Sequence, residues 1–242
     1  LELTNRKMAD IKMVVNGAGA SAIACIELIK SMGVQNDQIT LCDSKGVIYE
    51  GREEGMNQWK SAHAIPTSER SLEDAVKGAD VLFGLSVKGA VSGEMIKTMR
   101  DRPIIFAMAN PDPEIKPEEL ASIRNDAIVA TGRSDYPNQI NTVLGFPYIF
   151  RGALDVRAST INDEMKSAAA YALAELARED VPDEVDDAYG GKRLQYGPNS
   201  IIPAPFDPRL ISSIPPAVAE AAITSKVARP PLQEMEMSRP QL

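Results

Sequence analysis

The sequence has few of the residues that build disulfide frameworks, metal clusters and membrane spans. It contains two cysteines, Cys25 and Cys42, and a single histidine, His63. Both cysteines lie in apolar segments, so we expect reduced thiols and a cytoplasmic protein rather than a disulfide framework. Two cysteines and one histidine argue against a Cys/His metal cluster. No apolar run approaches the roughly 18 residues that a membrane span needs.

Positive charge is also scarce. Lys and Arg number 26 against 34 Asp and Glu, and the net charge of −8 comes without a basic stripe. Binding to nucleic acid or to a membrane is therefore not expected, and the partners should be small molecules or other protein. The hydrophobic content of 44% and charged content of 25% are typical of a globular domain with a substantial core.

Short apolar runs alternate with longer amphipathic stretches over about the first 130 residues. This alternation predicts an α/β fold, a Rossmann-like doubly wound parallel sheet with additional C-terminal helices. Helices are predicted over residues 21–32 and 71–77 and from Pro117 onward. The predicted strands are residues 11–15, 39–42, 81–85, 104–108 and 128–131.

Beyond Gly132 the alternation with strands ends. We expect residues 1–228 to form one domain and residues 229–242 to be a linker or tail, because the tail has no apolar periodicity. The second part is predicted to contain a polar loop at 134–141, a helix at 163–177, a surface loop at 180–200 and, after Pro215 and Pro216, a final helix at 218–227.

A glycine-rich turn joins the first predicted strand to the first predicted helix. It has the pattern GxGxxA, in which the first glycine makes the turn, the second admits a pyrophosphate and the small third residue permits close packing. The helix N-terminus adds partial positive charge. The alternative is that small residues serve packing alone. The residues predicted to bind a dinucleotide here are Gly17, Ala18, Gly19, Ala20 and Ser21.

Asp43 stands 24 residues after Gly19, at the end of the second predicted strand. This is near the spacing of the acid that binds the adenosine ribose in dinucleotide-binding folds. Asp43 would favour NAD by repelling a 2′-phosphate, whereas Ser44 and Lys45 could accept that phosphate and admit NADP. The sequence leaves the choice between NAD and NADP open.

Polar residues follow the later strands, where ligands bind in doubly wound sheets. Asn110 comes after the fourth predicted strand and could contact a nicotinamide or a substrate; a turn before Pro111 is the alternative. Gly84 and Ser86 could allow a cofactor near the backbone or merely permit tight packing. His63 has no evident partner and is interpreted as structural or exposed. We therefore assign no catalytic residue and no metal ligand to this chain.

Several longer strings together resemble the bacterial malic enzymes, and among these the larger form in which a phosphotransacetylase-like region follows the malic domain. The likeness extends over nearly the whole chain. Its strings are residues 14–20, 42–52, 109–115, 131–139, 146–155 and 202–207.

The resemblance implies oxidative decarboxylation of (S)-malate to pyruvate and carbon dioxide, with reduction of NAD or NADP and with Mg²⁺ or Mn²⁺ in the complete enzyme. That enzyme is expected to be a homo-oligomer. Asn110 matches a family asparagine near nicotinamide and malate, and Asn141 matches the first of a substrate-binding pair. The second position of that pair is Thr142 here, which departs from the family pattern.

The family's catalytic tyrosine and lysine and its metal-binding acids belong to a preceding region, expected to end before Leu1. The chain alone is therefore expected to be an inactive cofactor-binding part. Two other interpretations are a different Rossmann dehydrogenase, such as an amino-acid dehydrogenase, and a non-catalytic nucleotide-binding regulatory or assembly module.

Overall fold

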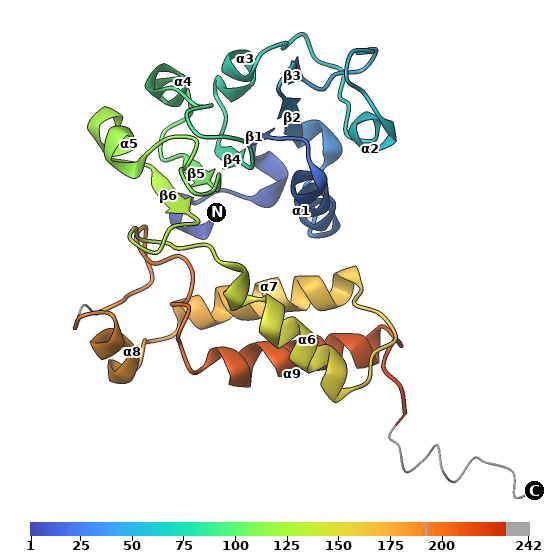
Figure 1. The fold of residues 1–242 in the computed structure, drawn as a ribbon, viewed down its shortest axis with the longest axis vertical. Helices are drawn as coiled ribbons and strands as arrows, with labels where there is room; N and C mark the ends of the chain where they lie inside the picture. Colours follow the sequence, from blue (N-terminus) through green and yellow to red (C-terminus); the bar gives the residue numbers. More distant parts are fainter. Residues whose placement is uncertain (192, 231–242) are drawn as a thin grey trace, which may run out of the picture. The chain divides into compact units, whose positions relative to one another are not determined.

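The computed structural model of the chain describes residues 1–191 and 193–230, which fold into two compact units (Figure 1). The sheet unit contains Leu1–Ile140 and Gly197–Ser200. The helical unit contains Asn141–Tyr196 and the segment that starts at Ile201. The predicted domain of residues 1–228 thus spans both units, and residues 231–242 of the predicted tail lie outside the described residues.

The sheet unit is built on six strands in the order β3-β2-β1-β4-β5-β6. All neighbours are parallel except β2 and β3, which are antiparallel. This order confirms the predicted Rossmann-like fold, with the chain reversing its direction of growth between β1 and β4. The strands are β1 (Met13–Asn16), β2 (Ile39–Asp43), β3 (Gly46–Val47), β4 (Val81–Gly84), β5 (Ile104–Ala107) and β6 (Ile128–Thr131).

The five predicted strands are all present, but β3 was not predicted. It is only two residues long and carries no apolar periodicity. Gly46 turns the chain back along β2 with a φ of 103°, and a Cβ there would lie 2.1 Å from the Arg70 carbonyl oxygen. Pairing with Cys42 and Asp43 therefore makes this segment a strand.

Helices cover both faces of the sheet. α1 lies on one side, and α3, α4 and α5 lie on the other (Figure 1). Ser71 and Ser92 cap α3 and α4 by accepting hydrogen bonds from backbone N–H groups of the first turn. The helices are α1 (Ala20–Ser31), α2 (Gln58–Ser61), α3 (Leu72–Val76), α4 (Gly93–Lys97) and α5 (Pro117–Ile123), with 3-10 turns at Glu2–Thr4, Met8–Asp10 and Asn36–Gln38.

Alternate strand residues point to opposite faces, and both faces are apolar. Val14, Leu82 and Ile105 lie side by side in register and pack in one core with residues of α3, α4 and α5. Ala22 and Ile26 of α1 are completely buried. Because β1, β2, β4, β5 and β6 run parallel, their carboxyl ends lie along one edge of the sheet.

The helical unit packs α9 against both α6 and α7. Leu144, Met165 and Leu210 contribute to its core. Gly152 lets α6 approach α9 closely, since a Cβ there would lie 2.5 Å from the Pro215 carbonyl oxygen. The elements are a 3-10 turn (Thr142–Leu144), α6 (Phe146–Asp155), α7 (Asp163–Arg178), α8 (Asp183–Ala188) and α9 (Leu210–Thr224).

Two predictions for this unit were wrong. α9 begins at Leu210, ahead of Pro215 and Pro216, because Leu210 and Ile214 are fully buried in the helical core and stabilise turns that the prolines weaken. The predicted surface loop at 180–200 contains α8, where acidic first-turn residues suit a helix N-terminus. None of the helices in the described ranges is long and apolar enough to cross a membrane.

Candidate cofactor-binding site

The glycine turn after β1 leaves space where a pyrophosphate would bind. Gly17 has a φ of +117°, and a Cβ there would lie 2.3 Å from the Leu85 carbonyl oxygen, so only glycine fits this turn. At Gly19 an added Cβ would meet nothing within 4 Å. Gly19 is also the N-cap of α1 and offers no side-chain hydrogen bond to the first turn.

The first turn of α1 therefore presents backbone N–H groups to open space. Gly19, Ala20 and Ser21 are exposed, whereas the helix is anchored further along by buried Ala22. An uncapped helix N-terminus beside a glycine turn fits an anionic phosphate in both shape and charge. The structure thus places the predicted turn residues where a dinucleotide could reach them, although their contacts with a cofactor stay a prediction.

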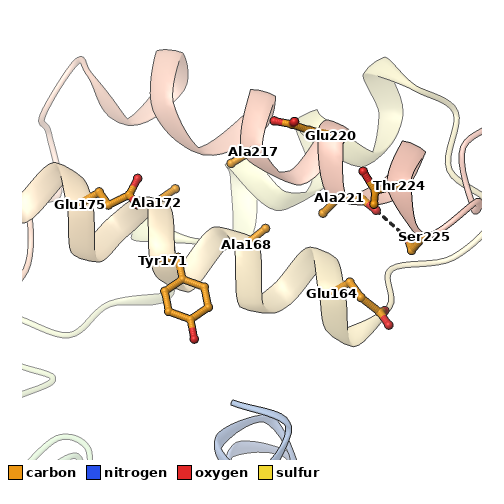
Figure 2. Close-up of a pocket in the computed structure, with 10 residues that line it drawn as sticks. All are labelled: Glu164, Ala168, Tyr171, Ala172, Glu175, Ala217, Glu220, Ala221, Thr224 and Ser225. Atoms are coloured by element: carbon orange, nitrogen blue, oxygen red, sulfur yellow. Dashed lines mark hydrogen bonds between the residues drawn. The ribbon is translucent and has the colours of Figure 1, made fainter. Parts of the chain in front are cut away.

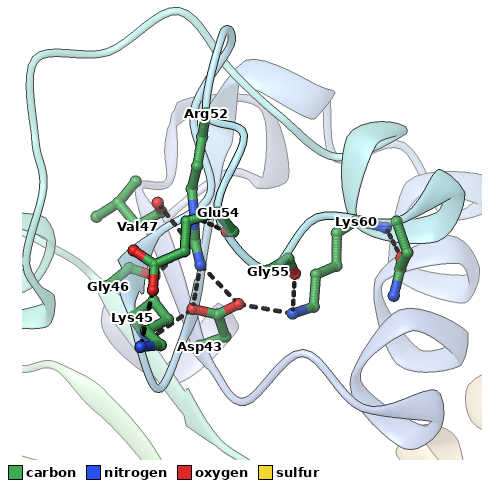
Figure 3. A network of polar contacts seen from close by, with 9 residues as sticks. Asp43, Lys45, Gly46, Val47, Arg52, Glu54, Gly55 and Lys60 are labelled. Carbon is green, nitrogen blue, oxygen red and sulfur yellow. Dashed lines mark hydrogen bonds and ion pairs between the residues drawn. The ribbon is translucent and has the colours of Figure 1, made fainter.

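Asp43, at the end of β2, is held by two cations (Figure 3). Arg52 donates to both carboxylate oxygens at 2.7 and 2.9 Å, and Lys60 donates to Oδ2 at 2.7 Å. The Lys45 backbone N–H donates to Oδ1 at 2.8 Å. A carboxylate offers about four acceptor positions, so all those of Asp43 are occupied.

This arrangement changes the expected role of Asp43. Burial alone would raise the pKa of its carboxyl, but hydrogen bonds from Lys60 and Arg52 outweigh burial and hold the pKa below its usual value. A ribose hydroxyl could bond to Asp43 only by displacing one of its present donors. One carboxylate among two cations leaves the cluster with a net positive charge, which suits an anionic group.

Lys45 and Ser44 lie on the exposed turn between β2 and β3. The Lys45 ammonium contacts the Glu54 carboxylate at 2.8 Å, with both side chains more than half exposed. Ser44 makes no side-chain hydrogen bond within the described residues. Lys45 is therefore already neutralised in part, whereas Lys60 reaches Asp43 directly.

Arg52 and Lys60 were not predicted as site residues. They follow Asp43 by 9 and 17 residues, at no spacing that a helix or strand pattern would reveal. Arg52 also donates to the carbonyl oxygens of Val47 and Glu54, so the same side chain fixes the turn and neutralises Asp43. Only the folded loop brings these groups together.

His63 is buried, with 2% of its surface exposed. The Lys30 ammonium donates to Nδ1 at 2.7 Å, and Nε2 lies 3.2 Å from the Glu27 carboxylate. Burial first, and then the charge of Lys30, lowers the pKa of His63. A neutral ring that accepts from Lys30 and donates to Glu27 satisfies both contacts, so this histidine is buried and has partners rather than being exposed.

The two predicted asparagines belong to different units. Asn110 directly follows Ala109 beyond the end of β5, is exposed and makes no side-chain hydrogen bond within the described residues. Asn141 is exposed and caps the 3-10 turn, accepting from the Val143 backbone N–H at 3.0 Å. Its amide nitrogen stays available for a ligand. Their substrate contacts remain predictions.

The helical unit has a groove of its own. It encloses about 610 Å³ between α7 and α9. Figure 2 shows Ala168 and Ala172 of α7 facing Ala217 and Ala221 of α9 across it. No predicted site residue lines this groove.

Comparison with known proteins decides the family of this chain. The family model described as "Malic enzyme, NAD binding domain" matches residues 1–186. This chain belongs to the malic enzyme family. The match confirms the predicted resemblance and its expectation of a domain that binds NAD or NADP.

Relatives in the malic enzyme family include proteins named for either cofactor. An "NADP-dependent malic enzyme" of Rhizobium meliloti is 67% identical over the whole chain, and an "NAD-dependent malic enzyme" of the same organism is 48% identical over 98% of it. The crystal structure of Entamoeba histolytica malic enzyme matches 96% of this chain with a TM-score of 0.83 and 38% identity, over 46% of its own length.

The chain spans about a third of the length of the two malic enzymes from Rhizobium meliloti, 32% and 31%. Among residues 1–191 and 193–230, no group of three or more His, Cys, Asp or Glu side chains is placed to hold a metal ion. Within the malic enzyme family, the described part of this chain corresponds to the domain that binds the NAD cofactor.

Proposed function

We propose that this chain binds NADP as the cofactor domain of an enzyme that oxidises (S)-malate to pyruvate and carbon dioxide. The observation that carries the choice of NADP is the Asp43 cluster. The two cations on Asp43 replace the repulsion that a lone carboxylate would exert on a 2′-phosphate with a net attraction. The name of the most identical relative quoted above supports the same cofactor.

In this proposal each part of the sheet edge has one task. The first turn of α1 binds the pyrophosphate through backbone N–H groups, with Gly19 leaving room for it. Lys60 attracts the 2′-phosphate, with Lys45 as a weaker second cation, and Asn110 orients the nicotinamide or malate. When bound, the dinucleotide supplies the hydride acceptor.

The catalytic tyrosine and lysine and the site for Mg²⁺ or Mn²⁺ are proposed to belong to the region that precedes this domain in the family. The complete protein is proposed to be a cytoplasmic homo-oligomer, in keeping with the two free thiols of this chain. We assign no proton transfer to the described residues, because His63 is buried and bonded to Lys30 and Glu27.

Replacing Gly19 by valine tests cofactor binding. The added side chain would occupy the open space beside α1 without meeting protein atoms within 4 Å at its Cβ, so the fold should persist while the pyrophosphate is excluded. Calorimetry with NADP should show binding to the 242-residue chain and none to Gly19→Val at equal thermal stability. Unchanged binding by the folded variant would refute the site.

A second experiment tests the activity. The purified chain, assayed with malate, Mn²⁺ and either cofactor, should produce no NADPH or NADH. Joining it to the preceding region of the family in one polypeptide should restore turnover, since general acid-base groups typically contribute about 10²- to 10⁴-fold. Robust turnover by the chain alone would show that the catalytic groups lie within it.

A further inference from the structure

Glu114 is a buried carboxylate that the proposed site does not use. Only 1% of the residue is exposed, although it lies four residues after Asn110. Its Oε1 accepts from the Ser86 backbone N–H at 2.8 Å and from the Ser86 hydroxyl at 3.3 Å. Its Oε2 accepts from the Ala109 backbone N–H at 3.0 Å. One side chain therefore joins two separate loops.

These loops follow neighbouring strands. Ser86 comes two residues after β4, and Ala109 comes two residues after β5 and directly before Asn110. The Asn16 side chain, at the end of β1, donates to the Ser86 hydroxyl at 2.8 Å. The network thus runs along the carboxyl ends of three adjacent strands, across the point between β1 and β4 where the strand order reverses and dinucleotides bind.

The end of β4 is shaped to admit this carboxylate. A Cβ on Gly84 would lie 2.6 Å from the Glu114 carboxyl carbon, so any larger residue would push the acid away. Of the two interpretations of Gly84, tight packing is the one that the structure bears out here. No Lys or Arg forms an ion pair with Glu114 within the described ranges. Its hydrogen-bond partners are therefore neutral groups, two backbone N–H groups and one hydroxyl.

We propose that Glu114 is a positioning residue for the nicotinamide half of the cofactor site. Its carboxylate holds the Ser86 loop and the Ala109 turn at a fixed separation, so that Asn110 and the end of β4 meet one bound nucleotide. In a doubly wound sheet each half binds one mononucleotide. Asp43 lies in the half that binds the adenosine ribose, and Glu114 lies in the other half.

This inference rests on the proposed cofactor binding and is tested by separating the two halves of the ligand. Adenosine 2′,5′-bisphosphate carries only the adenosine half of NADP. Calorimetry on the 242-residue chain should show that Glu114→Gln weakens NADP binding about tenfold, the effect of losing a charged hydrogen bond, while the fragment binds as before. The glutamine amide would place a donor against a backbone N–H.

Gly84→Ala is an independent second variant, because it displaces the carboxylate without altering any charge. It should reproduce the selective loss of NADP affinity. Glu119→Gln, which removes a charge from an exposed residue of α5, is the matched control and should bind both ligands as the wild type does.

The outcomes separate the two proposals. If the wild type binds both ligands and the Glu114 and Gly84 variants lose NADP affinity alone, Glu114 positions the nicotinamide half. If both variants bind both ligands normally, or lose both equally or fail to fold, the positioning role is overturned. If the wild type binds neither ligand, the proposed function itself fails.

Discussion

Two carboxylates, the partly buried Asp43 and the buried Glu114, lie at the same edge of the sheet, and their surroundings are opposite. Asp43 follows β2 and is held by two cations, Arg52 and Lys60. Glu114 is reached by backbone N–H groups and the Ser86 hydroxyl, with no cation in contact among the residues described. Ionic contacts hold the first acid, whereas neutral donors hold the second, which joins two loops.

The acid with a recognisable sequence spacing is therefore not the one whose side chain connects the strand-end loops. Asp43 has the spacing of a ribose-binding residue, yet all its acceptor positions are filled. Glu114 stands in a proline-rich turn with no recognisable spacing, yet it connects the loops that follow β4 and β5. Side-chain partners decide what each acid can do.

Removing one of the two cations that hold Asp43 should have the largest effect on stability. Arg52→Met would leave Asp43 with one cation and remove the donor to the Val47 and Glu54 carbonyl oxygens, which should lower the free energy of unfolding by about 3 kcal/mol. Urea unfolding measures this loss. Arg133→Met, which breaks an exposed pair with Asp135, is the control and should cost less than about 1 kcal/mol. Equal losses would contradict the comparison.

The cations near Asp43 should also control the choice between NADP and NAD. Lys60→Ala is expected to weaken NADP about tenfold through loss of a charged contact with the 2′-phosphate, while NAD binding stays the same or improves as Asp43 gains a vacant acceptor. Lys45→Ala should weaken NADP less, because Lys45 is exposed and paired with Glu54. Titrating both variants with both cofactors measures this. If Lys60→Ala affects the two cofactors equally, the 2′-phosphate assignment is wrong.

Low pH should weaken the ion pairs of Asp43, because the pKa of its carboxyl is lowered in the folded protein. A carboxyl whose folded pKa lies below its unfolded value of about 3.9 contributes stability at higher pH and loses it as the pH falls through the folded value. Unfolding measured from pH 6 down to pH 2 should therefore decline less steeply in Asp43→Asn than in the wild type. Parallel profiles would show that the ion pairs contribute nothing to stability.

Titration of His63 should have the smallest effect on stability, and at a pH closer to neutral. Because its folded pKa is lowered, the unfolded chain takes up the proton first, and stability declines as the pH falls below about 6.5. His63→Gln should remove this part of the profile while keeping a side chain that can accept from Lys30 and donate to Glu27. Thermal unfolding at pH 7.5 and pH 5.5 measures the change. A variant that keeps the wild-type difference would place the titration elsewhere.

Much of the sheet unit could be predicted from local pattern. Continuous apolar runs predict strands covered on both faces, and all five such strands are present. The glycine turn was also accessible, since Gly17 is required by its φ and by the Leu85 carbonyl oxygen. By contrast, β3 and α9 depend on contacts that the pattern of apolar residues does not reveal. Backbone pairing with β2 makes residues 46–47 a strand. Burial of Leu210 and Ile214 in the helical core keeps α9 helical through Pro215 and Pro216.

Local patterns in the sequence are enough to predict five of the six strands, the glycine turn and the family, because periodicity, glycine positions and long strings are local properties. Tertiary structure alone decided which side chains meet at the sheet edge. Lys60 reaches Asp43 across 17 residues, and Glu114 reaches Ser86 across 28. Hydrogen bonds and ion pairs act over a few ångströms in space whatever the separation along the chain, so the fold sets the chemistry of both carboxylates.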